Sequence, residues 1–476
     1  MEETRAQAYL QLINALLTCP NGEKQQILQA NSELLDSGFL QICEVIAEKL
    51  AEEGQENQAH FLRNFASQIC DFWGINEEED SDNFEGKNPQ KYSNFMRQLL
   101  QAEQDSKSDV AVIYPMLARR QYLLNARFAE ILQQVAQNLI ADENPEKIES
   151  IIAVIENLSI HISKFPLGNT ANNIEIAIAG YQIVLSNWER GSQKWARTQN
   201  NLATAYWKRI RGDQPENIEK AIECYTSALE IYTRDGFSKN WATTQNNLAI
   251  AYYKRVKGDQ AENIEKAIDS YNAALAVYSR EAFRQDWAGT QNNLATAYLY
   301  RIRGDEAENV EMAIASYTAA LEFYTRDDFP ENYAMIQNNL ATAYFHRIMG
   351  EKPENLKKAI ELYHNALTIR TREDFPQDHT ATLSNLADLY RSNQQWQLAY
   401  DTYARAIETV EFLRGEIHSG DESKQKLAEE WNELYLGMVE VCIELKRYTE
   451  AVEYAERSKG QNLIELLSLK DLYPKG

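Results

Sequence analysis

The 476-residue chain has few of the residues that mark several common classes of protein. Only 10 prolines are present, which fits a mostly helical chain. No apolar run approaches the ~18 residues of a membrane-spanning helix, and the N-terminus lacks the basic and then apolar order of a secretory signal. The cysteines are odd in number, scattered and without a C-x-x-C pair, which argues for reduced, buried thiols in a cytoplasmic protein. They are Cys19, Cys43, Cys70, Cys224 and Cys442.

Positive charge is also scarce, since 48 Lys and Arg face 71 Asp and Glu and leave a formal net charge of −23. Such a chain repels phosphate groups, so neither nucleic acid nor an anionic membrane is an expected partner. Catalytic motifs are missing as well: there is no phosphate-binding loop, no H-E-x-x-H and no G-x-S-x-G. The sequence therefore predicts a non-enzymatic protein without a cofactor or a metal ion.

What the chain does contain is a regular repeat of 46 residues. The segment "TQNNLAIAYYKRVKGDQAENIEKAIDSY" starts at Thr244, close copies start at Thr198 and Thr290, and a fourth starts at Ile336. Within each copy, apolar residues recur at steps of three and four in two stretches, which is the pattern of two helices. Between them, Gly258 can end the first helix in the left-handed conformation, and either Asp259 or Asn263 can cap the second. A repeat of this size predicts an all-α solenoid.

These repeats resemble the tetratricopeptide repeat (TPR), whose pattern is W-x2-L-G-x2-Y and then A-x3-F on two antiparallel helices. Gln245 takes the place of the Trp, Leu248 and Ala249 that of the Leu-Gly pair, and Ala267 and Tyr271 match the second helix. The resemblance implies a TPR-like α-solenoid, a right-handed superhelix of antiparallel helix pairs. Because 46 residues exceed the usual repeat length, we expect both helices to be extended.

Weaker copies of the pattern lie on both sides of the clear ones. The segment "IENLSIHISKFPLGNTANNIEIAIAGY" precedes them, and "TLSNLADLYRSNQQWQLAYDTYARAI" and one more divergent pair follow. We therefore predict about seven helix pairs in one continuous solenoid, residues 146–470, with a C-terminal tail at 471–476. Before the solenoid, residues 1–75 and 91–145 are predicted to be two related helical units. The acidic stretch between them, residues 76–90, contains Gly and Pro and is predicted to be a loop.

Asparagine doublets recur in the first helix of each clear repeat. An Asn inside a helix is unfavourable because its short amide competes with backbone hydrogen bonds, so the repetition needs a reason. In TPR proteins the first helix lines a concave groove, where Asn can bind a peptide backbone, and N-N-L-A is similar to kinesin-light-chain-type repeats. The alternative is that Asn bridges neighbouring helices, and we expect one Asn of each kind per doublet. The doublets are Asn200 and Asn201, Asn246 and Asn247, Asn292 and Asn293, and Asn338 and Asn339.

Further side chains of the first helices are predicted to complete a peptide-binding groove. Large amphipathic residues near the ends of these helices can anchor a ligand. These predicted groove residues are Thr204, Trp207, Lys208, Tyr253, Lys254, Tyr300 and Phe345. An arginine follows in each repeat and either pairs with Glu219, Glu265, Glu311 or neighbouring carboxylates, or holds an acidic ligand. The arginines are Arg209, Arg255, Arg301 and Arg347, and Phe237, Phe283, Phe329 and Phe375 are expected to pack between repeats.

The C-terminal segment "YAERSKGQNLIELLSLKDLYPKG" resembles the junction where such repeats meet a CHAT domain, a caspase-like protease, in cyanobacterial proteins. The resemblance covers residues 150–476 and is to the repeat arm without the CHAT domain, since the His–Cys dyad of that family lies beyond the point that corresponds to Gly476. It implies a bacterial scaffold that binds a protein or peptide segment and is the sensing arm of a CHAT-type protease, joined to it or acting in trans. The apolar "LIELL" would then contact that following domain. The alternative is an autonomous TPR adaptor unrelated to proteolysis.

Overall fold

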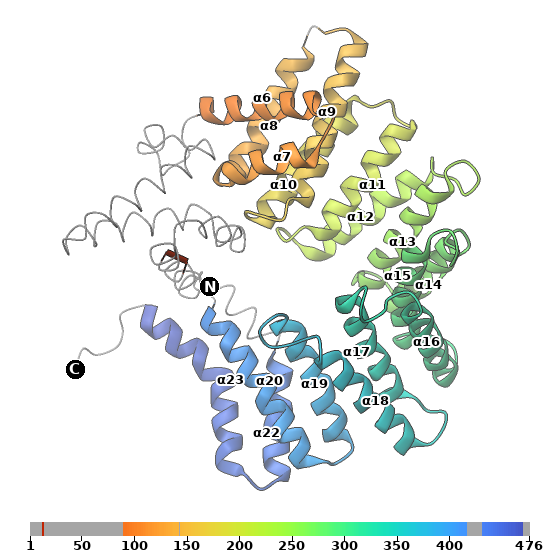
Figure 1. Ribbon diagram of the computed structural model, residues 1–476, viewed down its shortest axis with the longest axis vertical. Helices are drawn as coiled ribbons and strands as arrows, with labels where there is room; N and C mark the ends of the chain where they lie inside the picture. Colours follow the sequence, from red (N-terminus) through yellow and green to blue (C-terminus); the bar gives the residue numbers. More distant parts are fainter. Residues whose placement is uncertain (1–11, 14–88, 142, 417–430, 470–476) are drawn as a thin grey trace, which may run out of the picture. The chain divides into compact units, whose positions relative to one another are not determined.

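The computed structural model describes residues 12–13, 89–141, 143–416 and 431–469. These ranges contain 17 α-helices, one short 3-10 helix and no strand (Figure 1). The prediction of an all-α chain of paired helices is thereby confirmed. Most of the predicted N-terminal unit and acidic loop, and the whole C-terminal tail, lie outside the described residues. The chain divides into two compact units, one of Glu85–Arg370 and one of Met1–Phe84 with Thr371–Gly476.

The larger unit begins with three helices that share a core with the first helix pair. Apolar residues recur at helical spacing in each of them, and buried side chains such as Phe95, Leu99 and Phe128 pack against Ile155 and Val184. This single core therefore extends across the predicted domain boundary at residues 145–146. The helices are α6 (Pro89–Asp105), α7 (Val110–Arg119) and α8 (Ala126–Ile140), with η2 (Gln121–Leu123), and the pair is α9 (Pro145–Lys164) and α10 (Thr170–Asn187).

Four further pairs follow α10, and within this unit the second helix of a pair packs against the first helix of the pair that follows it. The pairs are α11 (Gln193–Lys208) and α12 (Gln214–Leu229), α13 (Ser238–Lys254) and α14 (Gln260–Leu275), α15 (Arg284–Leu299) and α16 (Glu306–Leu321), and α17 (Pro330–His346) and α18 (Lys352–Leu367). The other unit contains the pairs α19 (Pro376–Ser392) with α20 (Trp396–Glu416), and α22 (Asn432–Glu444) with α23 (Tyr448–Leu469). In the third pair, the 46 residues divide into a first helix of 17 residues, a second of 16, and connections at 255–259 and 276–283.

The residues that carry the TPR pattern form the interior of the stack. Ala249 and Ala267 are fully buried, so the two helices of a pair approach closely, and Tyr271 fills the space beside them. Between repeats, the Tyr278 ring lies 5.7 Å from that of Phe283. Trp241, Trp287 and Phe283 pack against the buried Tyr278 and its neighbours, which confirms the prediction for Phe283.

The turn between the two helices of a pair has the predicted glycine and cap. Gly258 has φ +84°, and the Asp259 carboxylate accepts a hydrogen bond from the Glu262 N–H at 2.7 Å. Asp259 is thus the N-cap of α14. Asn263, the alternative cap, instead closes the turn, because its Nδ2 donates to the Lys257 carbonyl at 2.9 Å.

We expect Gly258→Val to lower the free energy of unfolding by about 1 kcal/mol, because a branched side chain is strained in the left-handed conformation. Thermal denaturation followed by circular dichroism measures the effect. Lys257→Val is the matched control, since Lys257 lies in the same turn without a positive φ. Equal melting temperatures for the wild type and Gly258→Val would show that the turn tolerates the change.

Candidate functional site

The first helices of successive pairs lie next to one another in the larger unit. Contacts join α11 to α13, α13 to α15 and α15 to α17. We call the exposed surface of α11, α13, α15 and α17 the inner face. It carries the predicted peptide-binding residues.

The first Asn of a doublet bridges two neighbouring first helices. The Thr244 hydroxyl of α13 donates to Asn200 Oδ1 of α11 at 3.1 Å. One repeat later, the Thr290 hydroxyl of α15 donates to Asn246 Oδ1 of α13 at 3.2 Å. Because each bond crosses from one helix pair to the next, these amides stabilise the stack, which is the structural role expected for one Asn of each doublet.

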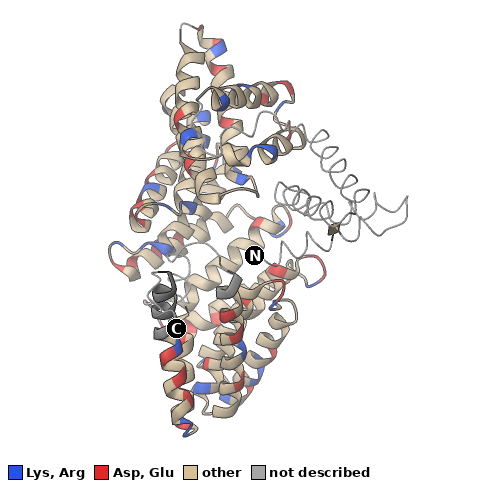
Figure 2. Ribbon diagram, turned by 90° about the vertical axis from the view of Figure 1, so that its left-hand side faces the viewer, with Lys and Arg blue, Asp and Glu red and all other residues tan. Residues whose placement is uncertain are grey.

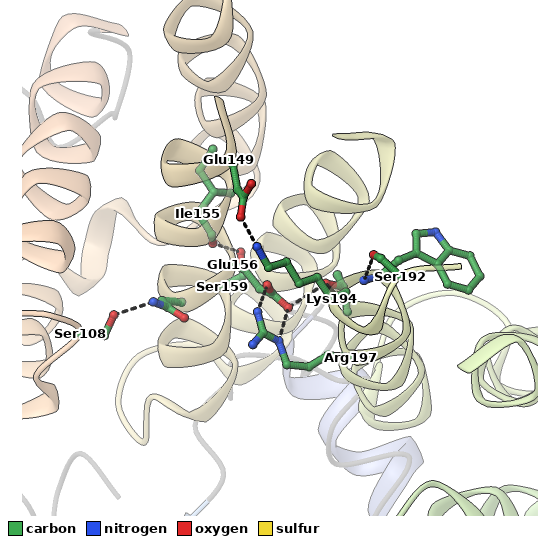
Figure 3. Close-up of polar contacts among 11 residues, drawn as sticks. Ser108, Glu149, Ile155, Glu156, Ser159, Ser192, Lys194 and Arg197 are labelled. Carbon is green, nitrogen blue, oxygen red and sulfur yellow. Dashed lines mark hydrogen bonds and ion pairs between the residues drawn. The ribbon is translucent and has the colours of Figure 1, made fainter. Parts of the chain in front are cut away.

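A carboxylate takes the same place in α9 (Figure 3). Glu156 is fully buried, and its Oε1 accepts a hydrogen bond from the Thr198 hydroxyl at 2.7 Å. Arg197 of α11 points at the same carboxylate, with Nη2 2.6 Å from Oε2. Glu156 was not predicted from the sequence, although a signal was available: Glu156 stands two residues before Leu158, just as Asn200 stands two residues before Leu202.

The series of bridging bonds is interrupted between α15 and α17. Ile336 stands where the earlier repeats have threonine, and its side chain is fully buried and offers no donor. As a result, Asn292 Oδ1 is buried without a hydrogen-bond partner. A buried carbonyl oxygen without a partner costs stability, so this joint depends more on apolar packing than the two before it.

The second Asn of a doublet has other hydrogen-bond partners than the first. Asn247, Asn293 and Asn339 are half-buried, and their Oδ1 atoms accept from the Nδ2 atoms of the preceding asparagines at 3.4, 3.2 and 3.2 Å. No acceptor among the described residues is found for their own Nδ2 groups. Asn201, the corresponding residue of α11, is half-buried too. The second asparagines therefore offer a row of amide donors, one per repeat.

In α9 the equivalent amide already has an acceptor from another segment. Asn157 Nδ2 donates to Ser108 Oγ at 2.7 Å, and Figure 3 shows Ser108 reaching it from the α6–α7 side. Ser108 and Lys107 both have left-handed backbones, with φ 64° and 55°, in the turn that makes this contact. The second-Asn position is thus able to bind a polar group that a separate stretch of chain presents.

Aromatic side chains stand at the ends of the first helices, six or seven residues after the second asparagines. Trp207 and Tyr300 are exposed, while Tyr253 and Phe345 are half-buried. Burial raises the pKa of Tyr253 to about 12, and nearby Tyr300 adds to the shift. Desolvation also raises the pKa of Tyr300, although 52% of the residue is exposed.

The remaining predicted groove residues are one threonine and two lysines. The Thr204 hydroxyl lies 2.9 Å from the Tyr225 hydroxyl, so it ties α11 to α12. Lys208 is exposed at the end of α11, and the Lys254 ammonium lies 5.5 Å from the centre of the Tyr253 ring. The two lysines are therefore accessible to a ligand, whereas the threonine has a partner within its own repeat.

The arginine that recurs in each clear repeat is paired with a carboxylate of the protein itself. Arg255 Nε donates to Glu219 Oε1 and Arg255 Nη2 donates to Glu219 Oε2, both at 2.7 Å. Glu219 belongs to the preceding repeat. This hydrogen-bonded pairing lowers the pKa of Glu219, and Arg255 Nη1 also contacts Asn263 Oδ1 at 3.3 Å. Of the two alternatives, pairing with carboxylates is confirmed. The other pairs are Arg209 with Glu175, Arg301 with Glu265, and Arg347 with Glu311.

Two cysteines, Cys224 and Cys442, lie in the described part of the chain. Burial raises the pKa of Cys224 to about 12 and that of Cys442 to about 11, so both thiols are protonated at neutral pH and poor nucleophiles. Among the described residues, no group of three His, Cys, Asp or Glu side chains could hold a metal ion.

A membrane-spanning helix is not found among the described helices, since none combines the necessary length with sufficient apolar character. Charges of both signs are interspersed along the helices (Figure 2).

Comparison with known proteins agrees with this architecture. Residues 190–301 match the family model of soluble NSF attachment protein, SNAP, and residues 287–331 match a tetratricopeptide repeat model. Among curated protein sequences, none is significantly similar to this chain. Neither matching model describes an enzyme.

Solved structures similar to this chain are distant. BtubC from P. vanneervenii is 17% identical with a TM-score of 0.29, covering 60% of this chain and 91% of its own. A STAND protein with a tetratricopeptide repeat sensor, PH0952 from Pyrococcus horikoshii, is 14% identical with a TM-score of 0.41, and the match covers 98% of this chain and 74% of that one. The apo form of RapI is 14% identical with a TM-score of 0.43, and the match covers 80% of this chain and 98% of RapI. The family models and the stacked helix pairs together show that this chain contains repeats of the tetratricopeptide type, which generally mediate protein–protein interactions.

Proposed function

We propose that this chain is a non-enzymatic scaffold that binds a segment of a partner protein along its inner face. The observation that carries the proposal is the difference between the two asparagines of a doublet. The first amide bridges neighbouring helices at Asn200 and Asn246, whereas the second asparagines keep an Nδ2 donor for which no acceptor among the described residues is found. The donors belong to Asn201, Asn247, Asn293 and Asn339.

The spacing of these donors suits a peptide backbone. Packed helices lie about 8–10 Å apart, so one donor recurs at about that interval along the inner face. An extended segment presents a backbone carbonyl about every 3.3 Å, so it offers carbonyls within reach of successive donors. Trp207, Tyr253, Tyr300 and Phe345 stand at the ends of the same helices and offer apolar surface to the side chains of that segment. The Ser108–Asn157 contact supports this mode of binding, since a separate stretch of chain occupies an equivalent amide.

A more specific form of the proposal assigns this scaffold to a CHAT-type protease as its sensing arm. It rests on the resemblance of the C-terminal segment to repeat–protease junctions. The side chains of Leu463, Leu466 and Leu467, which would contact the protease domain, lie outside the described side chains. Copurification of a caspase-like protein from the native cell supports this form, and its absence favours an autonomous adaptor. Purified chain with a peptidase activity that one Cys or His substitution abolishes would contradict the scaffold itself.

We expect the double variant Asn247→Ala, Asn293→Ala to bind a peptide selected from a random display library about 5- to 150-fold more weakly than the wild type. The reason is that each hydrogen bond contributes about 0.5–1.5 kcal/mol. Isothermal titration calorimetry measures the affinity, and circular dichroism checks that the melting temperature is unchanged.

The matched control is Asn246→Ala, the neighbouring residue of one doublet. It removes the bond to Thr290, so it should lower the melting temperature. The affinity of the folded Asn246→Ala protein should change less than that of the double variant. If instead the double variant melts like the control, the second asparagines are structural and the inner face loses its proposed role.

A further inference from the structure

A tyrosine recurs in the second helix of the pairs from α9–α10 to α19–α20, and its hydroxyl reaches the first helix of the same pair. The Tyr317 hydroxyl, for example, lies 2.8 Å from the Thr296 hydroxyl. Tyr271 of α14 is the exception, because no hydrogen-bond partner is found for its hydroxyl among the described residues. The other tyrosines and their partners are Tyr181 with Ser163, Tyr225 with Thr204, Tyr363 with Thr342, and Tyr403 with Asp388.

The cause is the residue of α13 that faces Tyr271. Ile250 stands where the other clear repeats have threonine, and its side chain has no polar atom. Tyr271 is only 2% exposed, and a buried hydroxyl without a partner costs free energy. Burial raises the pKa of Tyr271, and nearby Tyr253 adds to the shift, so the hydroxyl remains a neutral hydrogen-bond donor.

The Tyr271 hydroxyl is placed at the inner face. By equivalence with the tyrosine–threonine pairs of the other repeats, it ends beside Ile250. Asn247, Ile250 and Lys254 follow one another at steps of three and four residues, so they share one side of α13. Asn247 and Ile250 are half-buried, and Lys254 is exposed. The hydroxyl therefore lies between an amide donor and an ammonium group.

The groups around this hydroxyl are donors and aromatic rings. The Lys254 ammonium lies 5.5 Å from the centre of the Tyr253 ring and has no ion-pair partner in the part of the chain that the structure describes. Burial raises the pKa values of Tyr253, Tyr271 and Tyr300, and no carboxylate of the described residues contributes to these three shifts. An acceptor of hydrogen bonds is thus the group that the place lacks.

The acidic residues of the surrounding helices interact with other groups. The helix α13 contains none, and α14 and α15 together contain four. They are Glu262 with Lys266, Glu265 with Arg301, Asp269 also with Arg301, and Asp286 with Tyr278.

We propose that Tyr271 and Lys254 form a subsite of the inner face that binds one acidic side chain of the partner segment. The inference rests on the proposed function, since the rest of that segment lies along the inner face. A carboxylate carries one negative charge, which matches one ammonium group, and its two oxygens can accept from the Tyr271 hydroxyl and from Lys254 or Asn247. A phosphoryl group carries a charge of about −1.5 to −2 at pH 7 and is typically bound by clusters of arginine instead.

Peptides selected on the wild-type protein from a random display library are expected to share a glutamate or aspartate at one position. The probe is one such peptide made synthetically, together with a copy in which the acidic residue is replaced by the corresponding amide. Fluorescence anisotropy should show about 10- to 100-fold weaker binding of the amide copy, which is the loss of a hydrogen bond to a charged group. Tyr271→Phe should weaken binding of the acidic probe by about tenfold with an unchanged melting temperature, because its hydroxyl has no described partner to lose.

Two further variants test the cause. Ile250→Thr keeps Tyr271 but offers its hydroxyl the partner that Thr296 gives to Tyr317, so it should reduce the preference for the acidic probe as Tyr271→Phe does. Tyr317→Phe is the matched control. It loses the bond to Thr296, so its melting temperature should fall while its ratio of acidic to amide affinity stays that of the wild type.

Equal affinity ratios in the wild type, Tyr271→Phe and Ile250→Thr would overturn the inference. A lowered melting temperature of Tyr271→Phe would do so as well, since its hydroxyl would then have a structural role. Selected peptides that share no acidic residue, but lose affinity when Asn247 and Asn293 are replaced, would overturn this inference and leave the proposed function standing. Peptides whose binding is indifferent to those asparagines would contradict the proposed function, and the subsite with it.

Discussion

Replacing Arg197 with alanine is expected to lower the free energy of unfolding by about 2 kcal/mol. The substitution leaves the Glu156 carboxylate buried between α9 and α11 with the Thr198 hydroxyl as its remaining side-chain donor. Removing one partner of a fully buried ion pair costs about 3–5 kcal/mol. We expect a smaller effect because 49% of the Arg197 side chain is exposed, so solvent already screens part of the interaction.

Urea denaturation followed by circular dichroism measures this effect, and two further variants test its cause. Adding Glu156→Gln to Arg197→Ala should recover most of the loss, because the amide is neutral and its oxygen can still accept from Thr198. Lys194→Ala removes another ion pair of α11, with Glu149, in which both side chains are about half exposed. It should cost less than about 0.5 kcal/mol. Similar losses for Lys194→Ala and Arg197→Ala would contradict the account of a buried charge.

Gly180→Ala is the second substitution with a large expected effect, again about 2 kcal/mol of unfolding free energy. A Cβ atom at this position of α10 would lie 1.9 Å from Ser159 Oγ and 3.0 Å from Ser159 Cβ. Ser159 belongs to α9 and is almost fully buried, so the two helices must separate or the serine must leave its rotamer. Overpacking of this kind costs about 1–3 kcal/mol, more than the gain from the better helix propensity of alanine.

The rescue variant combines Gly180→Ala with Ser159→Gly and thereby moves the side-chain volume from α9 to α10. It should regain most of the lost stability, measured by the same urea denaturation. Gly289→Ala in α15 is the matched control, since the nearest atom to its added Cβ is the Tyr324 hydroxyl at 3.3 Å. That control should change stability by less than about 0.5 kcal/mol. A rescue variant as unstable as Gly180→Ala alone would show that close approach to Ser159 is not the cause.

The local features of this protein could be predicted from its sequence. The 46-residue period and the steps of three and four apolar residues predicted paired helices, and α13 and α14 have the expected order. Gly258 was assigned to the turn from residue type alone, and Asp259 was one of two candidate caps, because a left-handed backbone and a free N–H group at a helix start each favour few residues. These assignments depend on residues close together in the chain, so the sequence by itself determined them.

The contacts between repeats were decided only by the tertiary structure. The doublet Asn246–Asn247 looks symmetrical in the sequence, and the stacking of α13 on α15 brings Thr290 to the first amide but not to the second. Arg255 likewise had several possible carboxylates, and the packed helices place Glu219 against it. Glu156 was missed because its partners, Thr198 and Arg197, lie on the next helix pair. Helix periodicity shows which face of a helix is buried, but the partner of a polar side chain across a joint depends on how two helices stack.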